Sequence, residues 1–510
     1  MPDVVLTGRD LSIDDVERVA LGGARVSLGG VAVGRIAAAR ALIERAVSSG
    51  TPTYGVNTGF GRFVDVAISR EDVGRLQLNL LRSHACGVGE PVAVEVVRAA
   101  MVLRANALAT GASGVRLETV ELLLGMLNGG VHPVVPSRGS LGASGDLAPL
   151  AHLALPLVGE GVAEFGGVRM GGGEALAQAG LVAVVLEAKE GLALINGTQF
   201  MAAIGALVLA RAERLVRIAD LAAAQSVEAV RGSRTPFSPE IQLLRPHPGQ
   251  ITSAANLYAL LDGSQINESH RWCGRVQDAY SLRCSPQVHG ACRDAIGYAR
   301  GVVAIELNAA TDNPLVFADQ DEVLSNGNFH GEPVAIALDT LKIALAELAG
   351  ISERRIERMV NPTMSEGLPP FLTKEGGLNS GFMIPHYVAA SLVAENKVLC
   401  HPASVDSIPT SAGQEDHVSM GATAAVHAWQ VCHNVERVLA VELLCGAQGL
   451  DFLAPLRPGP AVTALHATLR ETSPHLADDR SLSAEIEQVA DRIRDGSILT
   501  AVQRTGTALG

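Results

Sequence analysis

A glycine-rich stretch from residue 139 to residue 150 reads Gly-Ser-Leu-Gly-Ala-Ser-Gly-Asp-Leu-Ala-Pro-Leu. Its central tripeptide, Ala143-Ser144-Gly145, can close into a five-membered ring if the nitrogen of Gly145 reaches the carbonyl carbon of Ala143. Loss of water from that ring and from Ser144 leaves a methylidene-imidazolone, an alkene conjugated to a carbonyl. Ordinary side chains include many nucleophiles, acids and bases but few electrophiles. The stretch can therefore supply chemistry that no ordinary side chain offers.

Glycines stand directly before this tripeptide and at its last position, as the ring closure requires. A β-carbon at Gly142 or Gly145 would obstruct the tight backbone approach, and both positions are glycine. The tripeptide alone says little, because Ala112-Ser113-Gly114 repeats it without the Gly-Asp-Leu-Ala-Pro context, and an Ala-Ser-Gly segment is usually an ordinary loop. The longer run around Ser144 is the informative feature.

The full run from Gly142 to Leu150, followed by His152 and Gly159-Glu160-Gly161, resembles the prosthetic-group loop of the histidine and aromatic amino acid ammonia-lyases. The resemblance implies that residues 143–145 form 4-methylidene-imidazole-5-one (MIO) autocatalytically, and that no metal or nucleotide is required. It also implies the mainly α fold that ammonia-lyases share with fumarase-like enzymes. It covers residues 50–450 densely and both ends of the chain loosely.

Length and composition restrict the possible partners. A chain of 510 residues can bury a large core in two or three domains. Its formal net charge of −13 argues against nucleic acid or an anionic membrane as a partner, and favours a small-molecule substrate. Seven cysteines without a Cys-x-x-Cys pair indicate reduced thiols. Since we find neither a signal peptide nor an apolar run of roughly 20 residues, we expect a cytoplasmic protein.

The pattern from residue 199 onward is mostly helical. Pro333 is well placed to begin a helix in which Leu338, Leu341, Leu345 and Leu348 recur at helical spacing, with Asp339, Lys342 and Glu347 between them. The segments near 201–230, 382–400 and 417–449 are similarly rich in Ala and Leu.

The first part of the chain is richer in glycine and proline, and Gly161 to Gly173 predicts a short β-hairpin. We therefore expect a mainly α fold in two parts. Residues 1–195 form a globular N-terminal part that carries the MIO loop, and residues 196–510 form a long-helix bundle that completes the active site.

Tyr54-Gly-Val-Asn-Thr-Gly-Phe-Gly61 is the first segment with candidate chemistry. A tyrosine in a glycine-rich turn is usually a lid over the core, but this run is similar to the mobile tyrosine loop of the family. The resemblance implies that Tyr54 is the catalytic base that removes a proton from the β-carbon of the substrate. A phenol with a pKa of about 10 needs nearby dipoles or cations for this role, and the sequence does not identify them.

Leu81-Arg-Ser83-His84-Ala-Cys-Gly87 bears on the choice of substrate. A lone histidine in such a context is more often a hydrogen-bonded core residue. Ser83-His84 nevertheless resembles the pair in histidine-directed members of the family, where phenylalanine- or tyrosine-directed members carry Phe-Leu or His-Leu. The resemblance implies that His84 hydrogen-bonds the imidazole of the substrate.

Four further residues match positions that bind substrate or surround the prosthetic group. Asn196, in an Asn-Gly pair that alone would indicate a turn, matches the asparagine that meets the carboxylate or amine of the substrate. Arg283 would hold the carboxylate as a two-pronged ion pair, which suits a planar guanidinium. Tyr280 and Gln277 would surround the loop and the amine.

Two segments complete the predicted site. Phe329, within Ser325-Asn-Gly-Asn-Phe-His-Gly331, matches a residue that packs beside the prosthetic group. Glu415 is a carboxylate where phenylalanine-directed members have an amide, and it can accept a hydrogen bond from imidazole and favour its cation. Glu415 and the Ser83-His84 pair thus agree on histidine.

The chain departs from the family pattern in two places. Gly413 stands where an asparagine is common, and Pro385-His386 stands where Ala-Gln is expected. Either departure could change loop packing or the surroundings of the site, which puts the efficiency of the reaction in doubt more than its type.

Other classes of function fit less well. The fourteen histidines include no His-Glu-x-x-His, and no dinucleotide or P-loop motif is present. An amidase-like hydrolase with Ser144 as nucleophile is an alternative, although the Gly-x-Ser-x-Gly elbow and a base partner are missing. A helical assembly without activity is another alternative. Near-ultraviolet absorbance from a cyclised loop would separate a lyase from both.

The reaction that the resemblance implies is the elimination of ammonia from L-histidine, without oxidation, to give trans-urocanate, the first step of histidine degradation. Addition of the amine to the electrophile would improve the leaving group, and Tyr54 would take the weakly acidic β-hydrogen. The family also implies a homotetramer whose active sites combine residues from more than one subunit. A tyrosine or phenylalanine ammonia-lyase, or an aminomutase of the same family, is the alternative.

Overall fold

The computed structural model describes residues 3–49, 53–59, 61–63 and 65–510, so Phe60 of the tyrosine segment lies outside the described residues. The described residues form two compact units. The first consists of Met1–Ala210, Ala299–Asp339 and Pro402–Trp429, and the second of Arg211–Tyr298, Thr340–His401 and Gln430–Gly510. Each unit is assembled from three separate segments of the chain, so these units do not correspond to the two continuous parts that we predict. The boundary between residues 195 and 196 stays a prediction.

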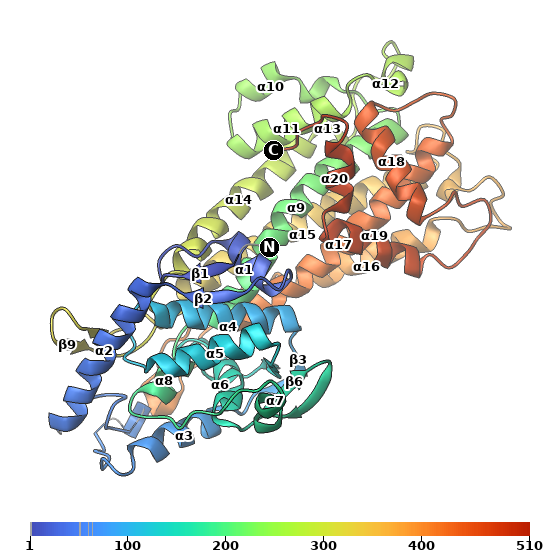
Figure 1. The fold of residues 1–510 in the computed structure, drawn as a ribbon. Coiled ribbons are helices and arrows are strands. Elements are labelled where there is room, and N and C mark those ends of the chain that lie inside the picture. Colours follow the sequence, from blue (N-terminus) through green and yellow to red (C-terminus); the bar gives the residue numbers. More distant parts are fainter. Residues whose placement is uncertain (1–2, 50–52, 60, 64) are drawn as a thin grey trace. The chain divides into compact units, whose positions relative to one another are not determined.

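Helices dominate the described residues, as the sequence predicts (Figure 1). The first unit contains α1 (Ile13–Ala20), α2 (Gly30–Ser49), α3 (Val73–His84), α4 (Val94–Ala109), α5 (Leu117–Gly129), α6 (Leu147–Ala154), α7 (Gly172–Gln178) and α8 (Glu190–Ile195). The second contains α10 (Pro239–Leu243), α11 (Pro248–Leu260), α12 (Gln265–Ser269), α13 (Tyr280–Arg283), α16 (Met383–Leu399), α18 (Pro460–Thr472), α19 (Ser483–Arg494) and α20 (Ser497–Gln503). Four long helices contribute residues to both units, namely α9 (Gln199–Ala229), α14 (Ser285–Glu306), α15 (Glu332–Val360) and α17 (Gly421–Asp451).

The strands are short and all lie in the first unit. The parallel pair is β1 (Val4–Leu6) with β2 (Val26–Leu28), and the antiparallel pairs are β3 (Val88–Pro91) with β5 (Pro136–Arg138) and β8 (Leu315–Phe317) with β9 (Glu322–Leu324). The remaining sheet has the order β4 (His132–Pro133), β6 (Val162–Phe165), β7 (Val168–Gly171). β6 and β7 form the predicted hairpin, and the turn between them uses Gly166 and Gly167 at φ values of 59° and 79°, which suit a tight hairpin turn.

α15 confirms the helix predicted after Pro333 and refines its pattern. Leu338, Leu341, Leu345 and Leu348 are all fully buried. Of the three polar residues between them, Glu347 is exposed, but Asp339 and Lys342 are buried. The carboxylate of Asp339 accepts a hydrogen bond from the backbone of Ser404, and the ammonium of Lys342 donates to the carbonyl of His401. Backbone partners therefore allow both charges to lie inside.

The other predicted helical segments also form helices, with one difference at a boundary. α9, α16 and α17 correspond to the segments near 201–230, 382–400 and 417–449. α17 begins at Gly421 and not at residue 417, because Met420 has a φ of 54°, which a right-handed helix cannot contain.

Three helices of the first unit pack against one another and place the candidate residues. α3, α6 and α8 are in mutual contact (Figure 1). α3 ends at His84, α6 begins directly after the loop of Ser144, and α8 ends directly before Asn196. α4 is also nearly completely buried and contributes a large share of the core of this unit.

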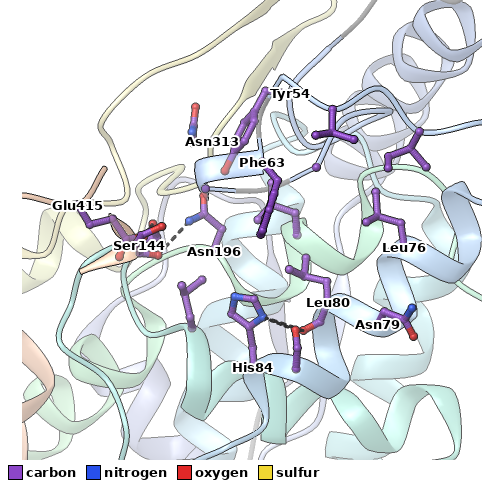
Figure 2. A pocket seen from close by; sticks show the side chains of 18 residues that line it. Tyr54, Phe63, Leu76, Asn79, Leu80, His84, Ser144, Asn196, Asn313 and Glu415 are labelled. Atoms are coloured by element: carbon purple, nitrogen blue, oxygen red, sulfur yellow. Dashed lines mark hydrogen bonds between the residues drawn. The ribbon is translucent and has the colours of Figure 1, made fainter. Parts of the chain in front are cut away.

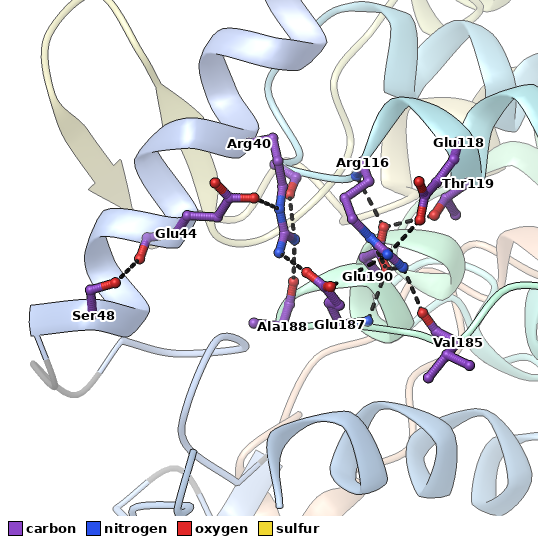
Figure 3. A network of polar contacts seen from close by, with 11 residues as sticks. Arg40, Glu44, Ser48, Arg116, Glu118, Thr119, Val185, Glu187, Ala188 and Glu190 are labelled. Atoms are coloured by element: carbon purple, nitrogen blue, oxygen red, sulfur yellow. Dashed lines mark hydrogen bonds and ion pairs between the residues drawn. The ribbon is translucent and has the colours of Figure 1, made fainter. Parts of the chain in front are cut away.

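A polar network fixes the beginning of α8 (Figure 3). The buried carboxylate of Glu190 accepts hydrogen bonds from Thr119 Oγ1 at 2.7 Å and from the guanidinium of Arg116 at 2.7 Å. Arg116 also donates to the carbonyl of Val185, and Arg40 forms an ion pair with Glu187. Because both oxygens of Glu190 have partners, its burial is compensated and α8 is held in place.

Two further observations concern the described residues as a whole. No helix among them combines the length and the apolar character needed to cross a membrane. None of the seven cysteines forms a disulfide within the described residues.

Candidate active site

A cavity of about 590 Å³ in the first unit brings together six predicted or flanking residues from five segments of the chain. Figure 2 shows Tyr54, His84, Ser144, Asn196 and Glu415 around this space. Ser83 completes the set, and the wall is otherwise mostly apolar. A largely apolar pocket with a few converging polar groups is the usual form of a small-molecule site.

The loop that carries Ser144 tolerates only glycine at its two flanks. Gly142 and Gly145 have φ values of 69° and 74°. A β-carbon on Gly142 would lie 2.1 Å from Oγ of Ser419, and one on Gly145 would lie 2.1 Å from the carbonyl oxygen of Gly197. The sequence predicts the need for glycine, and the structure shows that neighbouring segments impose it.

This packing predicts the effect of Gly145→Ala, with Gly130→Ala as its control. Gly130 has a φ of 78°, close to that of Gly145, but nothing within 4 Å of the position of a β-carbon. We expect Gly130→Ala to lower the free energy of unfolding by about 1–2 kcal/mol from backbone strain alone. Gly145→Ala should lower it by about 1–3 kcal/mol more, because the methyl group meets backbone. Chemical denaturation of the two variants side by side measures the difference, and equal losses would contradict the tight packing of Gly145.

Two donors converge on the carbonyl oxygen of Ser144. Nδ2 of Asn196 donates to it at 2.9 Å, and the backbone N–H of Gly197 donates to it at 3.3 Å. Oδ1 of Asn196 is buried and has no hydrogen-bond partner among the described residues. Asn196 can therefore polarise this carbonyl with its amino group while its oxygen is left to accept a hydrogen bond from a bound ligand.

A buried carboxylate lies directly after the loop. Asp146 accepts hydrogen bonds from the backbone of Met201, in the first turn of α9, at 2.9 Å and from Oγ of Ser140 at 3.2 Å. Complete burial raises the pKa of Asp146 to about 7, although these hydrogen bonds favour the charged form. The side chain of Asp146 thus joins the loop to the N-terminus of α9.

Tyr54 stands on a segment anchored in the core. Val56, two residues further on, is buried in a hydrophobic cluster with Leu42 and Ile43. Burial of the phenol raises the pKa of Tyr54 above its ordinary value of 10.0, and a hydrogen bond with the backbone of Gly61 acts in the opposite direction. The charges of Glu415 and Asp312 raise the pKa further.

The orientation of His84 follows from its position at the end of α3. Its Nδ1 lies 2.8 Å from the carbonyl oxygen of Leu80, and a carbonyl can only accept, so Nδ1 carries a hydrogen. Burial lowers the pKa of His84 below its ordinary value of 6.5, although the bond to Leu80 and the charge of Glu415 oppose this. The ring is therefore neutral near pH 7, and Nε2 is a hydrogen-bond acceptor.

Glu415 is held at the cavity by hydrogen bonds to Thr410, across the turn that precedes it. Its Oε2 accepts a hydrogen bond from Oγ1 of Thr410 at 2.8 Å, and its Oε1 lies 3.4 Å from the hydroxyl of Ser144. The turn before it contains three successive residues with positive φ, Ser411 at 52°, Ala412 at 54° and Gly413 at 84°. Gly413 accounts for one departure from the family pattern, because glycine and asparagine both adopt this conformation readily.

The remaining predicted residues do not line this cavity. Phe329 is half-buried in the turn before α15 and is not among the residues that line the cavity. Gln277, Tyr280 and Arg283 belong to the second unit. There, Gln277 and Arg283 line a cavity of about 500 Å³, and the guanidinium of Arg283 lies 4.7 Å from the ring centre of the exposed Tyr280.

The second departure from the family pattern, Pro385-His386, also lies in the second unit. Both residues are in the first turn of α16. Nε2 of His386 lies 2.8 Å from Oε1 of Glu353, so this histidine has a carboxylate partner within its own unit.

Sequence reasoning missed several polar residues at or near the cavity. Asn313 lines it, and its Oδ1 accepts a hydrogen bond from the backbone of Asn326 at 2.9 Å. Next to it, Asp312 forms a buried ion pair with Lys189 at 2.6 Å. The available signal was weak: a lysine two residues before the apolar run 191–195, and an Asp-Asn-Pro sequence that indicates only a turn.

Comparison with known proteins identifies the family. The family model described as "Aromatic amino acid lyase" matches residues 11–471. A curated relative from Anaeromyxobacter sp. (strain K), named histidine ammonia-lyase, is 57% identical over 98% of this chain and 100% of its own length.

Two solved structures agree with this relationship and with the fold predicted from the sequence. The histidine ammonia-lyase from Trypanosoma cruzi has 47% identity and a TM-score of 0.92, covering 98% of this chain and 95% of its own. The tyrosine aminomutase from Streptomyces globisporus has 40% identity and a TM-score of 0.94, covering 98% of both chains. The chain belongs to the aromatic amino acid lyase family.

Proposed function

We propose that this protein is a carbon–nitrogen lyase that eliminates ammonia from L-histidine to give trans-urocanate. The observation that carries the proposal is the shared cavity, in which the acceptor Nε2 of His84 and the carboxylate of Glu415 accompany Ser144. The relatives named histidine ammonia-lyase support the same assignment. Incubation with L-histidine should yield urocanate and ammonia in equal amounts, and a failure to form urocanate would refute the proposal.

The residues around Ser144 fit the MIO group. Gly142 and Gly145 occupy positions where a β-carbon would collide with neighbouring atoms, so the loop has glycine at the two positions where ring closure requires it. The carbonyl of Ser144, which would be conjugated to the alkene, already has two donors, from Asn196 and Gly197. When formed, MIO supplies an electrophile that makes the amino group of the substrate a better leaving group.

The side chains of the first unit divide the remaining work. The phenolate of Tyr54 takes the proton from the β-carbon. Asn196 donates to the carbonyl of Ser144, and its unpartnered Oδ1 accepts a hydrogen bond from the N–H of the neutral amino group of the substrate. The predicted contact of Asn196 is thus assigned to the amine and not to the carboxylate, because an oxygen acceptor would repel a carboxylate.

His84 and Glu415 recognise the ring of the substrate. Both present acceptors, and an imidazolium ring has two N–H donors. The neutral state of His84 matters here, because its protonation would convert Nε2 into a donor that faces the N–H of the substrate. Glu415 contributes charge as well, and so favours the imidazolium cation of the substrate.

The pH dependence of kcat/KM follows from Tyr54. Because burial raises the pKa of its phenol above 10.0, the fraction of active phenolate increases with pH throughout the neutral and alkaline range. We expect the ratio of kcat/KM for L-histidine in the wild type to that in Tyr54→Phe to rise from pH 7 to pH 9, because loss of the imidazolium cation of the substrate lowers both values alike. Tyr54→Phe should also lower kcat/KM itself, and a ratio that does not change with pH would contradict the role of Tyr54 as base.

The same shift affects stability in the opposite direction. Since the folded protein holds the proton of Tyr54 more tightly than the unfolded chain does, this contribution to stability is complete below pH 10 and is lost as pH rises through the raised pKa.

We assign Arg283 to the carboxylate of the substrate, Tyr280 and Gln277 to the surroundings of the amine, and Phe329 to the side of the prosthetic group. This assignment goes with a homotetramer in which one active site combines residues of more than one subunit. The exposure of Tyr280, at 72%, supports a contact with another copy. Light scattering should give four chains per particle, whereas a fully active monomer would rule out shared sites. A cytoplasmic location is part of the proposal.

An aminomutase is the second candidate, favoured by the TM-score of 0.94 to the Streptomyces globisporus tyrosine aminomutase. Such an enzyme would convert an α-amino acid into a β-amino acid without net release of ammonia. Chromatography of the products separates the two, because accumulation of a β-amino acid would replace urocanate and ammonia.

A further inference from the structure

Two histidines and a glutamate meet in the first unit, next to two of the segments described above. His330 and Glu332 lie at the beginning of α15, and His417 lies two residues after Glu415. One potential ligand atom from each of the three lies within 4.8 Å of the others. The imidazole rings of His330 and His417 are nearly parallel, at 7°, with their centres 5.8 Å apart.

Both ring nitrogens of His330 have long hydrogen bonds, and one oxygen of Glu332 has none within the described residues. Nδ1 of His330 accepts from the backbone N–H of Glu332 at 3.3 Å, and its Nε2 lies 3.3 Å from the carbonyl of His417, so both bonds are long. Oε2 of Glu332 is buried and has no hydrogen-bond partner among the described residues. A buried carboxylate oxygen without a partner is costly, and a cation beside it would remove that cost.

A second cluster in the protein shows the contrast. In the second unit, Asp451 binds His466 at 2.7 Å, His475 at 2.6 Å and the guanidinium of Arg470 at 2.7 Å. These partners lower the pKa of Asp451 to about 2, in spite of its burial. Asp451 therefore already has a cation, whereas no arginine or lysine contact is found for Glu332 within the described part of the chain.

We propose that His330, Glu332 and His417 bind a divalent transition-metal ion of the Zn²⁺ type. Two imidazoles and one carboxylate are a ligand set that zinc accepts, and they favour it over Ca²⁺ or Mg²⁺, which prefer oxygen ligands. Ligand atoms around tetrahedral zinc lie about 3.3–3.5 Å apart, as bond lengths of about 2.0–2.2 Å require. Since the three ligand atoms lie within 4.8 Å of one another, the most widely separated pair needs to close by at most about 1.3–1.5 Å.

The ion would join two segments that carry proposed site residues. His330 directly follows Phe329, and His417 lies in the loop that holds Glu415. A metal bound by both histidines ties the loop of Glu415 to the beginning of α15 and restricts its motion. The inference goes beyond the proposed reaction, in which no step uses the ion.

Zn²⁺ titration of the assembled, chelator-treated enzyme tests the site, with isothermal calorimetry as readout. We expect one ion per chain that is absent or bound more than about tenfold more weakly in His330→Ala and His417→Ala, since loss of an outer partner alone costs that much. Glu332→Gln keeps the size of the side chain and should also weaken binding. It carries the test if the alanine variants fail to fold.

His475→Ala is the matched control, because it removes a histidine from the cluster that already contains Arg470. It should leave Zn²⁺ binding unchanged. Because this control and the site variants all keep the exposed Cys86 and Cys273, any ion held by these thiols contributes equally to every measurement. Zn²⁺ should raise the Tm of the wild type and of His475→Ala but not that of His417→Ala. Equal Zn²⁺ binding in the wild type and in the three site variants, or none in the wild type, would overturn the proposal.

Discussion

We expect Ser144→Ala to leave a folded protein whose activity with L-histidine is at least about a thousandfold lower, which corresponds to about 4 kcal/mol of transition-state stabilisation. The reason is chemical, since alanine has no hydroxyl to lose and cannot become the alkene. The fold should persist, because the hydroxyl makes only a long contact of 3.4 Å with Glu415. The backbone bonds of Ser144 to Asn196 and Gly197 do not involve it.

The chain contains its own control for this variant. Ser113 lies in a second Ala-Ser-Gly tripeptide, and Gly114 has a φ of 71°, close to the 74° of Gly145. Ser113→Ala should keep full activity, the near-ultraviolet absorbance of the cyclised loop and its sensitivity to borohydride. Ser144→Ala should lose all three. Full activity in Ser144→Ala free of wild type would end the prosthetic-group hypothesis.

We expect L-histidine to be preferred over L-phenylalanine by about one and a half to four orders of magnitude. Nε2 of His84 and the carboxylate of Glu415 would be left without partners beside a phenyl ring, at a cost of about 1–3 kcal/mol each. Each 1.4 kcal/mol or so corresponds to a factor of ten in kcat/KM. Tyrosine offers a single hydroxyl group and should fall between the two.

Replacing the recognition residues should erode this preference. We expect the combination Ser83→Phe, His84→Leu and Glu415→Gln to lose most histidine turnover without creating a good phenylalanine enzyme. Asp416→Asn serves as the control, since Asp416 is an exposed carboxylate directly beside Glu415 that does not line the cavity. The ratio of kcat/KM values for the two amino acids gives the result, and an unchanged ratio in the triple variant would refute the roles of His84 and Glu415.

Much of the candidate site could be predicted from the sequence because its residues are in short motifs. Tyr54, His84, Ser144, Asn196 and Glu415 each stand in a run of residues with a family pattern, and the structure places all five at one cavity. The glycine requirement at Gly142 and Gly145 was predicted from backbone sterics, although the atoms that enforce it belong to Ser419 and Gly197, in distant segments.

Other features depend on contacts that no local pattern contains. The burial of Lys342 in α15 requires the carbonyl of His401, and the start of α17 at Gly421 depends on the backbone of Met420. The ion pair of Lys189 with Asp312 joins segments far apart in the sequence. Periodicity locates helices well, but it does not reveal which charged residue will find a partner in the interior.

The most direct test of the account is to incubate the purified protein separately with L-histidine, L-tyrosine and L-phenylalanine and to follow urocanate, coumarate and cinnamate by absorbance. The account predicts rapid formation of urocanate from L-histidine, with slower or no formation of the other two products. Faster deamination of tyrosine or phenylalanine than of histidine would contradict it.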